Sequence, residues 1–355
     1  MPRRTAAARR SRQIAMVFDL NKCVGCQTCA VACKMLWTKD DDRQDGTDYM
    51  WWCSVNTMPG RGYPRDWEQM GGGYRDGVLQ KGRLPAREDF GGGWDFNYAE
   101  VYYEGKGTSA HLAPVGKEPA WGPNWDEDQG AGDWPNSYFF YLPRLCNHCT
   151  HPACVEACPN GAMFKREADG LVLRDESLCQ GDQSCAAACP YKKIFFNEQR
   201  QVSQQCIMCF PRLEQGVAPA CARQCPGRMV FVGYLDDAEG PIHKLVHEWQ
   251  VALPLHPEYG TAPNIFYVPP LSPARLNDDG SPDEKQPRIP LEYLEGLFGP
   301  RVGPALDTLK AEMARTRSGK KSKLMDILTV YHWKGLFGPF ARDPSTIKLT
   351  PSERK

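Results

Sequence analysis

The run Cys23-Val24-Gly25-Cys26-Gln27-Thr28-Cys29-Ala30-Val31-Ala32-Cys33 spaces four cysteines as C-x2-C-x2-C-x3-C. This spacing is typical of cubane iron–sulfur sites, because cysteines three residues apart on a short loop reach three iron corners. The fourth cysteine of such a run starts a helix and points away from the loop. Where two clusters lie close together, it ligates the second one. The run therefore predicts a pair of neighbouring iron–sulfur clusters.

Three more cysteine groups follow, so that fifteen of the sixteen cysteines in the 355-residue chain belong to tight groups. They are Cys146, Cys149, Cys154 and Cys158; then Cys179, Cys185 and Cys189; then Cys206, Cys209, Cys221 and Cys225. A proline follows the last cysteine of each of these three groups, as in bacterial two-cluster proteins, whereas Lys34 follows Cys33. Four groups predict four clusters in one chain, an arrangement that suits electron transfer.

The order of the groups predicts how they pair. The second and third groups are neighbours in sequence and should form one two-cluster module, which leaves the first and fourth groups for the other. The expected fold is α+β, with two bacterial ferredoxin-like modules related by pseudo-twofold symmetry. The predicted ligand sets are Cys23, Cys26, Cys29 and Cys225; Cys33, Cys206, Cys209 and Cys221; Cys146, Cys149, Cys154 and Cys189; and Cys158, Cys179 and Cys185.

The third group lacks one cysteine, and Asp182 stands where the second cysteine of a C-x2-C-x2-C run belongs. Two outcomes are open. The corner is vacant and the cluster is [3Fe–4S], or the Asp182 carboxylate ligates iron in a [4Fe–4S] cluster. We favour the vacant corner, because thiolate is the softer and preferred ligand of such iron.

Other uses of cysteine fit the pattern less well. Tetrahedral zinc also takes C-x2-C pairs, but it does not require four cysteines within one short run or three Cys-Pro endings. Disulfides are disfavoured, because a chain of this length buries a core without them. His148 and His151 lie inside the second group and are expected to pack or to donate hydrogen bonds near cluster sulfur. Cys53 has no cysteine neighbours and is expected to be a buried, inert thiol.

The amino-acid composition argues against several other classes of protein. The 43 basic and 43 acidic residues give no net charge, which argues against a nucleic-acid partner. No apolar run approaches the roughly 20 residues that span a bilayer. Ten tryptophans suggest burial against partner subunits. We find no catalytic triad, paired acid–base motif or dinucleotide fingerprint, and expect no substrate active site in this chain.

The expected organisation follows from the cysteine groups. Residues 1–13 form a disordered basic tail, without the apolar stretch of a twin-arginine export signal. Residues 14–33 and 200–240 form one module, and 146–199 form the other. Residues 34–145 are a long insertion, rich in loops and strands, that packs on the core and on a catalytic subunit. Residues 241–355 are a helical C-terminal extension that contacts partner subunits.

Several elements are expected from local pattern. Short strands are predicted at Ile14–Leu20, Leu171–Leu173, Lys193–Phe196 and Met229–Tyr234. The proline-bounded segment Ala262–Pro270 is predicted to be extended and to lie on a surface. Helices are predicted at 241–250, Pro304–Arg317 and Lys323–Lys334, the last with Leu324, Ile327, Leu328 and Tyr331 on one face.

Together these motifs resemble the iron–sulfur β subunits of molybdenum enzymes of the dimethyl sulfoxide reductase family. The resemblance is strongest to the nitrate reductase-like branch, which includes ethylbenzene, dimethylsulfide and steroid side-chain dehydrogenases and selenate, chlorate and perchlorate reductases. It runs from Arg12 through CVGCQTCAVACKMLWT, YMWW, CNHCTHPACVEACPNGA and the fourth group to NIFYVPP, nearly the whole chain.

The resemblance implies three [4Fe–4S] clusters and one [3Fe–4S] cluster, the last on the third group. In the nitrate reductase version a tryptophan often takes the place of Asp182, and this chain departs from it there. The resemblance also implies an α subunit that carries the molybdopterin cofactor and, as a usual third partner, a haem b subunit. The chain would relay electrons between them, in the periplasm as a passenger exported with the α subunit or in a cytoplasmic, membrane-associated complex. A stand-alone polyferredoxin is the alternative.

Overall fold

The computed structural model describes residues 12–38, 47, 49–91, 94–97, 99–104, 109–114 and 130–346. The predicted basic tail therefore lies outside the described residues, except for its last two positions. Short helices and short strands alternate along the rest, which agrees with the α+β prediction at that level.

The strands are β1 (Ile14–Asp19), β2 (Ser54–Met58), β3 (Tyr74–Arg75), β4 (Val78–Leu79), β5 (Trp94–Phe96), β6 (Leu112–Pro114), β7 (Phe140–Arg144), β8 (Met163–Lys165), β9 (Val172–Arg174), β10 (Ile194–Asn197), β11 (Val202–Gln205), β12 (Val230–Tyr234), β13 (Leu253–Pro254), β14 (Ile265–Val268), β15 (Ala274–Leu276) and β16 (Pro282–Pro287). The α-helices are α1 (Thr28–Cys33), α2 (Ala153–Glu156), α3 (Ser184–Ala188), α4 (Phe210–Leu213), α5 (Ala220–Arg223), α6 (Pro241–His243), α7 (Leu291–Phe298), α8 (Val302–Arg317), α9 (Lys323–Leu328) and α10 (Trp333–Phe337).

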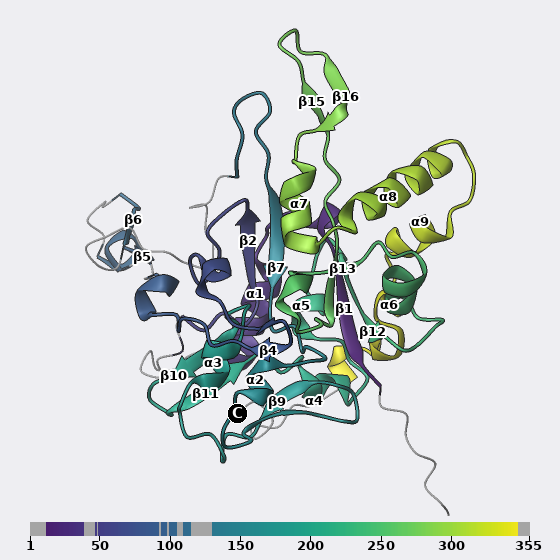
Figure 1. Cartoon of the computed structure of the whole chain (residues 1–355). Helices are drawn as coiled ribbons and strands as arrows, with labels where there is room; N and C mark the ends of the chain where they lie inside the picture. Colours follow the sequence, from purple (N-terminus) through teal and green to yellow (C-terminus); the bar gives the residue numbers. More distant parts are fainter. Residues whose placement is uncertain are drawn as a thin grey trace, which may run out of the picture.

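A four-stranded sheet in the order β12-β1-β14-β13 lies at the centre (Figure 1). All six residues of β1 are buried, as expected for an inner strand covered on both faces. β1 leads into Cys23, and β12 begins five residues after Cys225. The antiparallel pairing of β1 with β12 therefore brings the first and fourth cysteine groups together, although about 200 residues separate them along the chain.

The structure corrects the surface placement of the proline-bounded segment Ala262–Pro270. Its strand β14 lies inside the sheet, parallel to β1 and antiparallel to β13, and all four of its residues are buried. The prolines end the strand at Pro269, but they do not keep it at an edge, because the backbone between them is free to pair on both sides.

The second and third cysteine groups each include a short helix and lead into a hairpin. Strand β8 pairs with β9, strand β10 pairs with β11, and helix α2 packs on α3. In the same way α1 packs on α5, between the first and fourth groups. Figure 1 shows the helices α2 and α3 and the strands β9, β10 and β11 in teal, below the central sheet.

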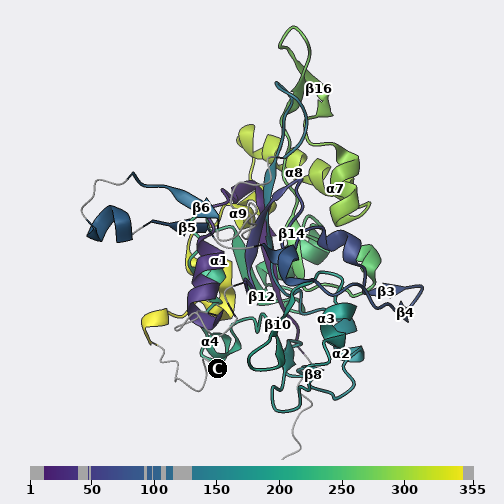
Figure 2. The same cartoon turned by 90° about the vertical axis from the view of Figure 1, so that its left-hand side faces the viewer.

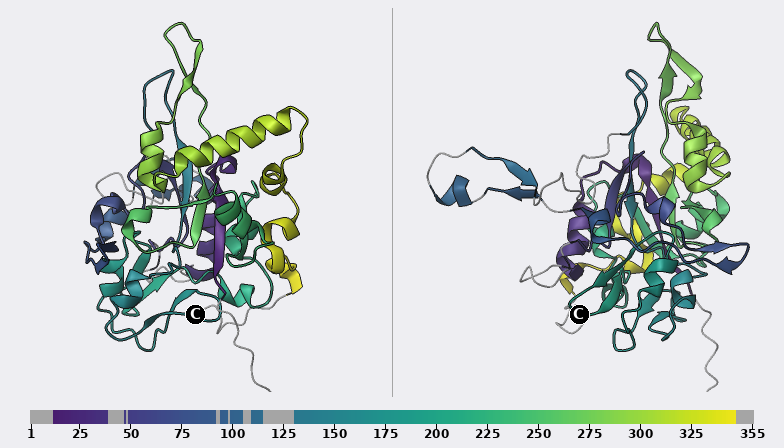
Figure 3. Two further views of the ribbon diagram at one scale, coloured as in Figure 1. Left: turned by 45° about the vertical axis from the view of Figure 1, so that its right-hand side comes forward. Right: turned by 60° about the vertical axis from the view of Figure 1, so that its left-hand side comes forward.

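The segment between the first two groups contributes paired strands. β2 pairs with β7 along five residues, close to the core, and β3 pairs with β4 in a short hairpin. The hairpin of β5 and β6 extends away from the body of the molecule (Figures 2 and 3). These strands agree in kind with the predicted insertion of strands and loops.

The C-terminal part is helical, but its helices differ from the prediction. The predicted helix at Lys323–Lys334 ends at Leu328, and a separate helix, α10, follows from Trp333. Tyr331 therefore lies in the connection with 71% of its surface exposed, and not on the buried face with Leu324 and Leu328. Helix α7 was not predicted. No helix in the described residues is long and apolar enough to span a membrane.

Candidate metal centres

Each cysteine group contains the same backbone turn. The residue two positions after the first cysteine of each group has positive φ: Gly25 at 65°, His148 at 42°, Gly181 (before Asp182) at 74° and Met208 at 54°. Glycine adopts this conformation at little cost, whereas His148 and Met208 are held in it by their surroundings. A Cβ atom added to Gly25 would lie 2.5 Å from the Tyr141 ring, so that position also requires glycine for space.

The first and third groups match over a longer stretch. Gln27 and Gln183 each have positive φ, at 58° and 56°, and each stands directly before a helix, α1 or α3. Between the matched residues, Asp182 holds the position that Cys26 holds in the first group. The loop of the third group thus keeps the form of a cluster loop, although a carboxylate replaces the thiol.

The first predicted set lies at the meeting of β1, α1 and the segment after α5. Burial raises the pKa of Cys23 to about 12, and repulsion from the nearby thiolates of Cys29 and Cys225 contributes to the rise. Cys26 is the exposed member of the set. The sixteenth cysteine, Cys53, is buried, as predicted. It lies beside Cys29, a predicted ligand, and lowers the pKa of that thiol.

The second predicted set lines a cavity, together with Trp37, Trp52 and Cys53. Its members are all buried: Cys33, Cys206, Cys209 and Cys221. Burial raises the pKa of Cys206 and Cys221, and repulsion between neighbouring thiolates of the set raises it further. The Nε1–H of Trp37 donates to Cys209 Sγ at 3.0 Å, and the N–H of Met208 donates to Cys206 Sγ at 3.3 Å.

The third predicted set lines a separate cavity, with Lys193 and Gln205 beside it. Its members are Cys146, Cys149, Cys154 and Cys189. Burial raises the pKa of Cys149 to about 12, although a hydrogen bond from Thr261 lowers it. Electrostatic repulsion also acts between Cys206 of the second set and Cys146 of the third, so the two sets are neighbours.

The fourth predicted set lines a third cavity, which also contains Asp182, Arg174 and Ser203. Its cysteines are Cys158, Cys179 and Cys185. Burial raises the pKa of Cys185 to about 11, and the nearby Ser203 hydroxyl acts in the opposite direction. The Oδ1 atom of Asp182 accepts the backbone N–H of Ser184 at 2.8 Å, at the start of α3.

The donor sets fit groups larger than one metal ion. All sixteen cysteines are free thiols. Among the residues that the structure describes, no three His, Cys, Asp or Glu side chains converge as ligands of a single ion do. Thiols instead surround cavities, and soft thiolate donors favour iron–sulfur clusters. Bound iron ions are positively charged and would also reduce the repulsion between ionised thiols, which contributes to their raised pKa values.

Comparison with known proteins agrees with this chemistry. Residues 137–235 match the model of the 4Fe-4S dicluster domain. The chain is 55% identical over 331 residues to the selenate reductase β subunit of Thauera selenatis, which covers 92% of this chain and 99% of that protein. It is 53% identical over 327 residues to the dimethylsulfide dehydrogenase β subunit of Rhodovulum sulfidophilum, with 92% and 98% covered. A respiratory nitrate reductase β chain of Escherichia coli is 33% identical over 426 residues, with 88% and 81% covered.

The chain belongs to the iron–sulfur β subunits of the dimethyl sulfoxide reductase family.

As a member of this β-subunit family, the chain is an iron–sulfur electron-transfer subunit, and a stand-alone polyferredoxin is not favoured. The match to the 4Fe-4S dicluster domain places a ferredoxin-like domain in the mixed α/β fold. It also accounts for the hairpins and helix pair that carry the second and third cysteine groups.

Two buried lysines lie beside the candidate clusters of this β subunit. Lys193 is 1% exposed, and its Nζ donates to the Trp51 carbonyl and to Ser54 Oγ, each at 3.1 Å. Burial lowers its pKa to about 7. Lys192 is fully buried and donates to the Ala187 carbonyl at 2.9 Å. The sequence does not reveal that these adjacent cations face inward, because Trp51 and Ser54, the partners of Lys193, lie about 140 residues earlier in the chain.

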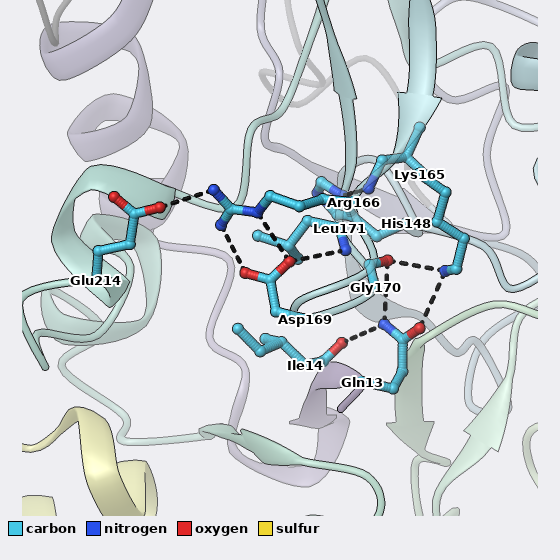
Figure 4. Close-up of polar contacts among 10 residues, drawn as sticks. Gln13, Ile14, His148, Lys165, Arg166, Asp169, Gly170, Leu171 and Glu214 are labelled. Carbon is cyan, nitrogen blue, oxygen red and sulfur yellow. Dashed lines mark hydrogen bonds and ion pairs between the residues drawn. The ribbon is translucent and has the colours of Figure 1, made fainter. Parts of the chain in front are cut away.

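A polar network fastens the β8–β9 turn to the N-terminal strand (Figure 4). Lys165 Nζ donates to Gln13 Oε1 at 3.0 Å, to the Cys149 carbonyl at 2.9 Å and to the Gly170 carbonyl at 2.8 Å. Arg166 bridges Asp169 and Glu214, which lies next to α4. These contacts hold the loop of the second cysteine group against both β1 and the fourth group.

The histidines of the second group are placed by packing. His148 is fully buried, and its Nδ1 accepts the backbone N–H of Val172 at 3.1 Å. Burial lowers its pKa to about 3, so the ring is neutral. His151 is exposed. The sequence does not show that Trp37 and Trp52 line the cavity of the second set, because no spacing rule connects a tryptophan to a distant cysteine.

Proposed function

We propose that the four predicted cysteine sets hold three [4Fe–4S] clusters and one [3Fe–4S] cluster. The observation that carries the proposal is the lining of three separate cavities by the second, third and fourth sets. The contacts of Cys23 with Cys29 and Cys225 support the first set. The [3Fe–4S] cluster belongs to Cys158, Cys179 and Cys185, with the vacant corner at Asp182.

The hydrogen bonding of Asp182 supports the vacant corner over a carboxylate ligand. Its Oδ1 accepts the N–H of Ser184, and its Oδ2 lies 3.5 Å from Asn160 Nδ2. Burial raises the pKa of Asp182, but the hydrogen bonds from Ser184 outweigh it and lower the pKa. The carboxylate therefore stabilises the start of α3, which leaves three thiolates for iron.

The clusters would lie in two modules with pseudo-twofold symmetry, one on 14–33 with 200–240 and one on 146–199. The repeated positive-φ turn and the two packed helix pairs, α1 with α5 and α2 with α3, support this symmetry. Residues 34–145 would pack on the core and on a catalytic subunit. Residues 241–355 would contact partner subunits.

We propose that the partners are an α subunit with the molybdopterin cofactor and a haem b subunit. The related proteins are β subunits of selenate reductase, dimethylsulfide dehydrogenase and nitrate reductase, which supports a multi-subunit molybdenum enzyme. Exposed apolar side chains surround the first set: Val24 at 68%, Met35 at 57% and Val31 at 42% exposure. These side chains suit contact with the α subunit beside the first set. The fourth set, at the other end of the series of four sites, would then face the haem b subunit. The complex would be periplasmic, exported with the α subunit.

When bound, the clusters would supply one-electron transfer along the chain of four sites. The protein's part is to hold the thiols in buried loops, to exclude water from the cavities and to place N–H donors and cations beside the sulfur atoms. The backbone turns at Gly25, His148, Gly181 and Met208 orient the thiols, and Lys193 supplies positive charge between the second and third sets. Substrate chemistry would belong to the α subunit.

The test is the metal content of the complex purified from its native host. We expect about fifteen iron atoms per chain, from three clusters of four and one of three, together with molybdenum and further iron in a co-purifying α subunit. EPR of the oxidised complex should show one [3Fe–4S] signal. Iron without molybdenum or a large partner would contradict the proposed assembly, and zinc in place of iron would contradict the clusters themselves.

A further inference from the structure

The cavity of the second cysteine set differs from the other two in its indole groups. Trp37 lies in the turn that follows α1, and its Nε1–H donates to Cys209 Sγ at 3.0 Å. Trp52 lines the same cavity. No tryptophan lines the cavities of the third and fourth sets in the part of the chain that is described. Two donors from separate segments thus meet at one site.

Among the described residues, the Nε1–H of Trp52 has no hydrogen-bond partner. The side chain is 4% exposed, and its Nε1 atom is buried without a hydrogen bond. Burying an N–H group without an acceptor is unfavourable, so such groups are rare in folded proteins. The cavity that Trp52 shares with Cys33, Cys206 and Cys221 is where an acceptor would lie. Sulfur bound there would accept the bond.

We propose that Trp37 and Trp52 act as a pair of indole N–H donors that raises the reduction potential of the cluster held by Cys33, Cys206, Cys209 and Cys221. This inference rests on the ligand set in the proposed function. An electron that enters the site adds one negative charge, which is spread over the thiolate and cluster sulfur. Hydrogen bonds to sulfur stabilise that charge, because the N–H dipole points toward it and water is excluded. Both tryptophans are positioning residues, not ligands.

Two substitutions separate the hydrogen bond from packing. Trp37→Phe and Trp52→Phe keep an aromatic ring at each site and remove only the N–H donor and part of the ring. The four reduction potentials are measured by EPR-monitored titration of the purified complex. The cluster of the second set is identified by the signal that Cys209→Ser alters. Trp249→Phe is the matched control, because Trp249 lines none of the three cysteine cavities.

We expect each variant to lower the potential of the same single cluster, the one that Cys209→Ser alters. The reduction equilibrium should shift by on the order of tenfold, or about 59 mV for one electron. The other three potentials should stay at their parent values, which serve as internal controls. Unchanged potentials in both variants, with parent iron content, would overturn the inference and leave the proposed clusters in place.

A second measurement needs no substitution and covers variants that fail to load iron. The parent complex is labelled with 15N in the tryptophan indole, and electron–nuclear double resonance is recorded on the reduced cluster of the second set. Hyperfine coupling to indole nitrogen is expected. Its absence, with the cluster present by EPR, would contradict the N–H bonds. Absence of the cluster itself would instead contradict the proposed function.

Discussion

At the scale of single residues, the proposed cluster type of the fourth set depends on Asp182. Its loop has the backbone form of the first group, so a thiol at this position would point where Cys26 points. We predict that Asp182→Cys converts the [3Fe–4S] cluster into a [4Fe–4S] cluster of lower potential, because an added thiolate brings negative charge. The checks are iron content and loss of the EPR signal of the oxidised parent. Asp175→Cys, an exposed change four residues before Cys179, should leave that signal unchanged.

Lys193 is the second residue whose effect is electrostatic. It lines the cavity of the third set and exerts a favourable charge interaction on Cys33 and Cys206 of the second set. Among the described residues no carboxylate forms an ion pair with it, so bound clusters would be its counter-charge. Lys193→Met should lower the potentials of these two clusters together and spare the other two. A titration in which only one of them shifts, or neither, would contradict this role.

At the scale of elements, an ion-pair group ties the hairpin β8–β9 to β10–β11. Glu176 pairs with Arg174 at the end of β9 and with Arg200 in the β10–β11 turn. Burial raises the pKa of Glu176, but the two arginines outweigh it and lower the pKa. The ion pairs of Glu176 therefore stabilise the folded protein at pH values above about 4.3, the carboxyl pKa in the unfolded chain. This stabilisation is lost as the pH falls through the lower pKa of Glu176 in the folded state.

We predict that Glu176→Gln destabilises this pair of hairpins by about 1–2 kcal/mol at pH 7.5, because Arg174 is left buried beside a neutral group. The measurement is the urea concentration at which the complex loses its visible cluster absorption. Glu198→Gln, an exposed change in the same β10–β11 region, should keep the parent value. An equal loss in both variants would show that general surface charge, and not the ion pair, stabilises the hairpins.

Helix α9 depends on its first residue. Ser322 is 3% exposed, and its hydroxyl oxygen accepts the N–H of Met325 at 3.1 Å. Ser322→Ala should cost about 1 kcal/mol, the usual value of such a cap. The amides of α9 should then exchange roughly fivefold faster with deuterium, while those of α8 keep their rates. Ser318→Ala is the control, because that exposed serine follows α8 and caps no helix start.

At the scale of the whole molecule, the cysteine sets and the helical C-terminal part are stabilised differently. The buried thiols surround cavities and repel one another when ionised, so bound metal would supply part of their folding free energy. Helices α7 and α8 pack through Leu294, Leu297, Leu306 and Leu309 and contain no cysteine. Their stability comes from apolar burial.

We predict that removal of iron with a chelator raises amide exchange first in residues 146–226. Exchange in Leu291–Arg317 should rise later and less. Hydrogen–deuterium exchange followed by mass spectrometry of the intact complex gives both regions in one experiment. A uniform rise across the chain would mean that the clusters stabilise the entire fold as a single cooperative unit.

The sequence by itself determined the donor chemistry, because cysteine spacing is a local property: a C-x2-C loop brings its thiols together whatever the rest of the chain does. The buried strand before Cys23, the strand after Cys225 and helix α8 also follow local pattern and lie close to their predicted ranges. The family was recognisable for the same reason.

Only the tertiary structure decided which distant residues meet. The central place of β14, the inward position of Lys193 and the convergence of Trp37 and Trp52 on one cavity each depend on contacts across long stretches of chain. The prolines favoured a surface position for β14, but this tendency is weaker than the strand pairing of β14 with β1 and β13. The charge of Lys193 also suits a surface position, but its side chain is buried by contacts with distant segments. The break after Leu328 is not marked by a proline or glycine within α9, and His332 caps the separate helix α10 that follows.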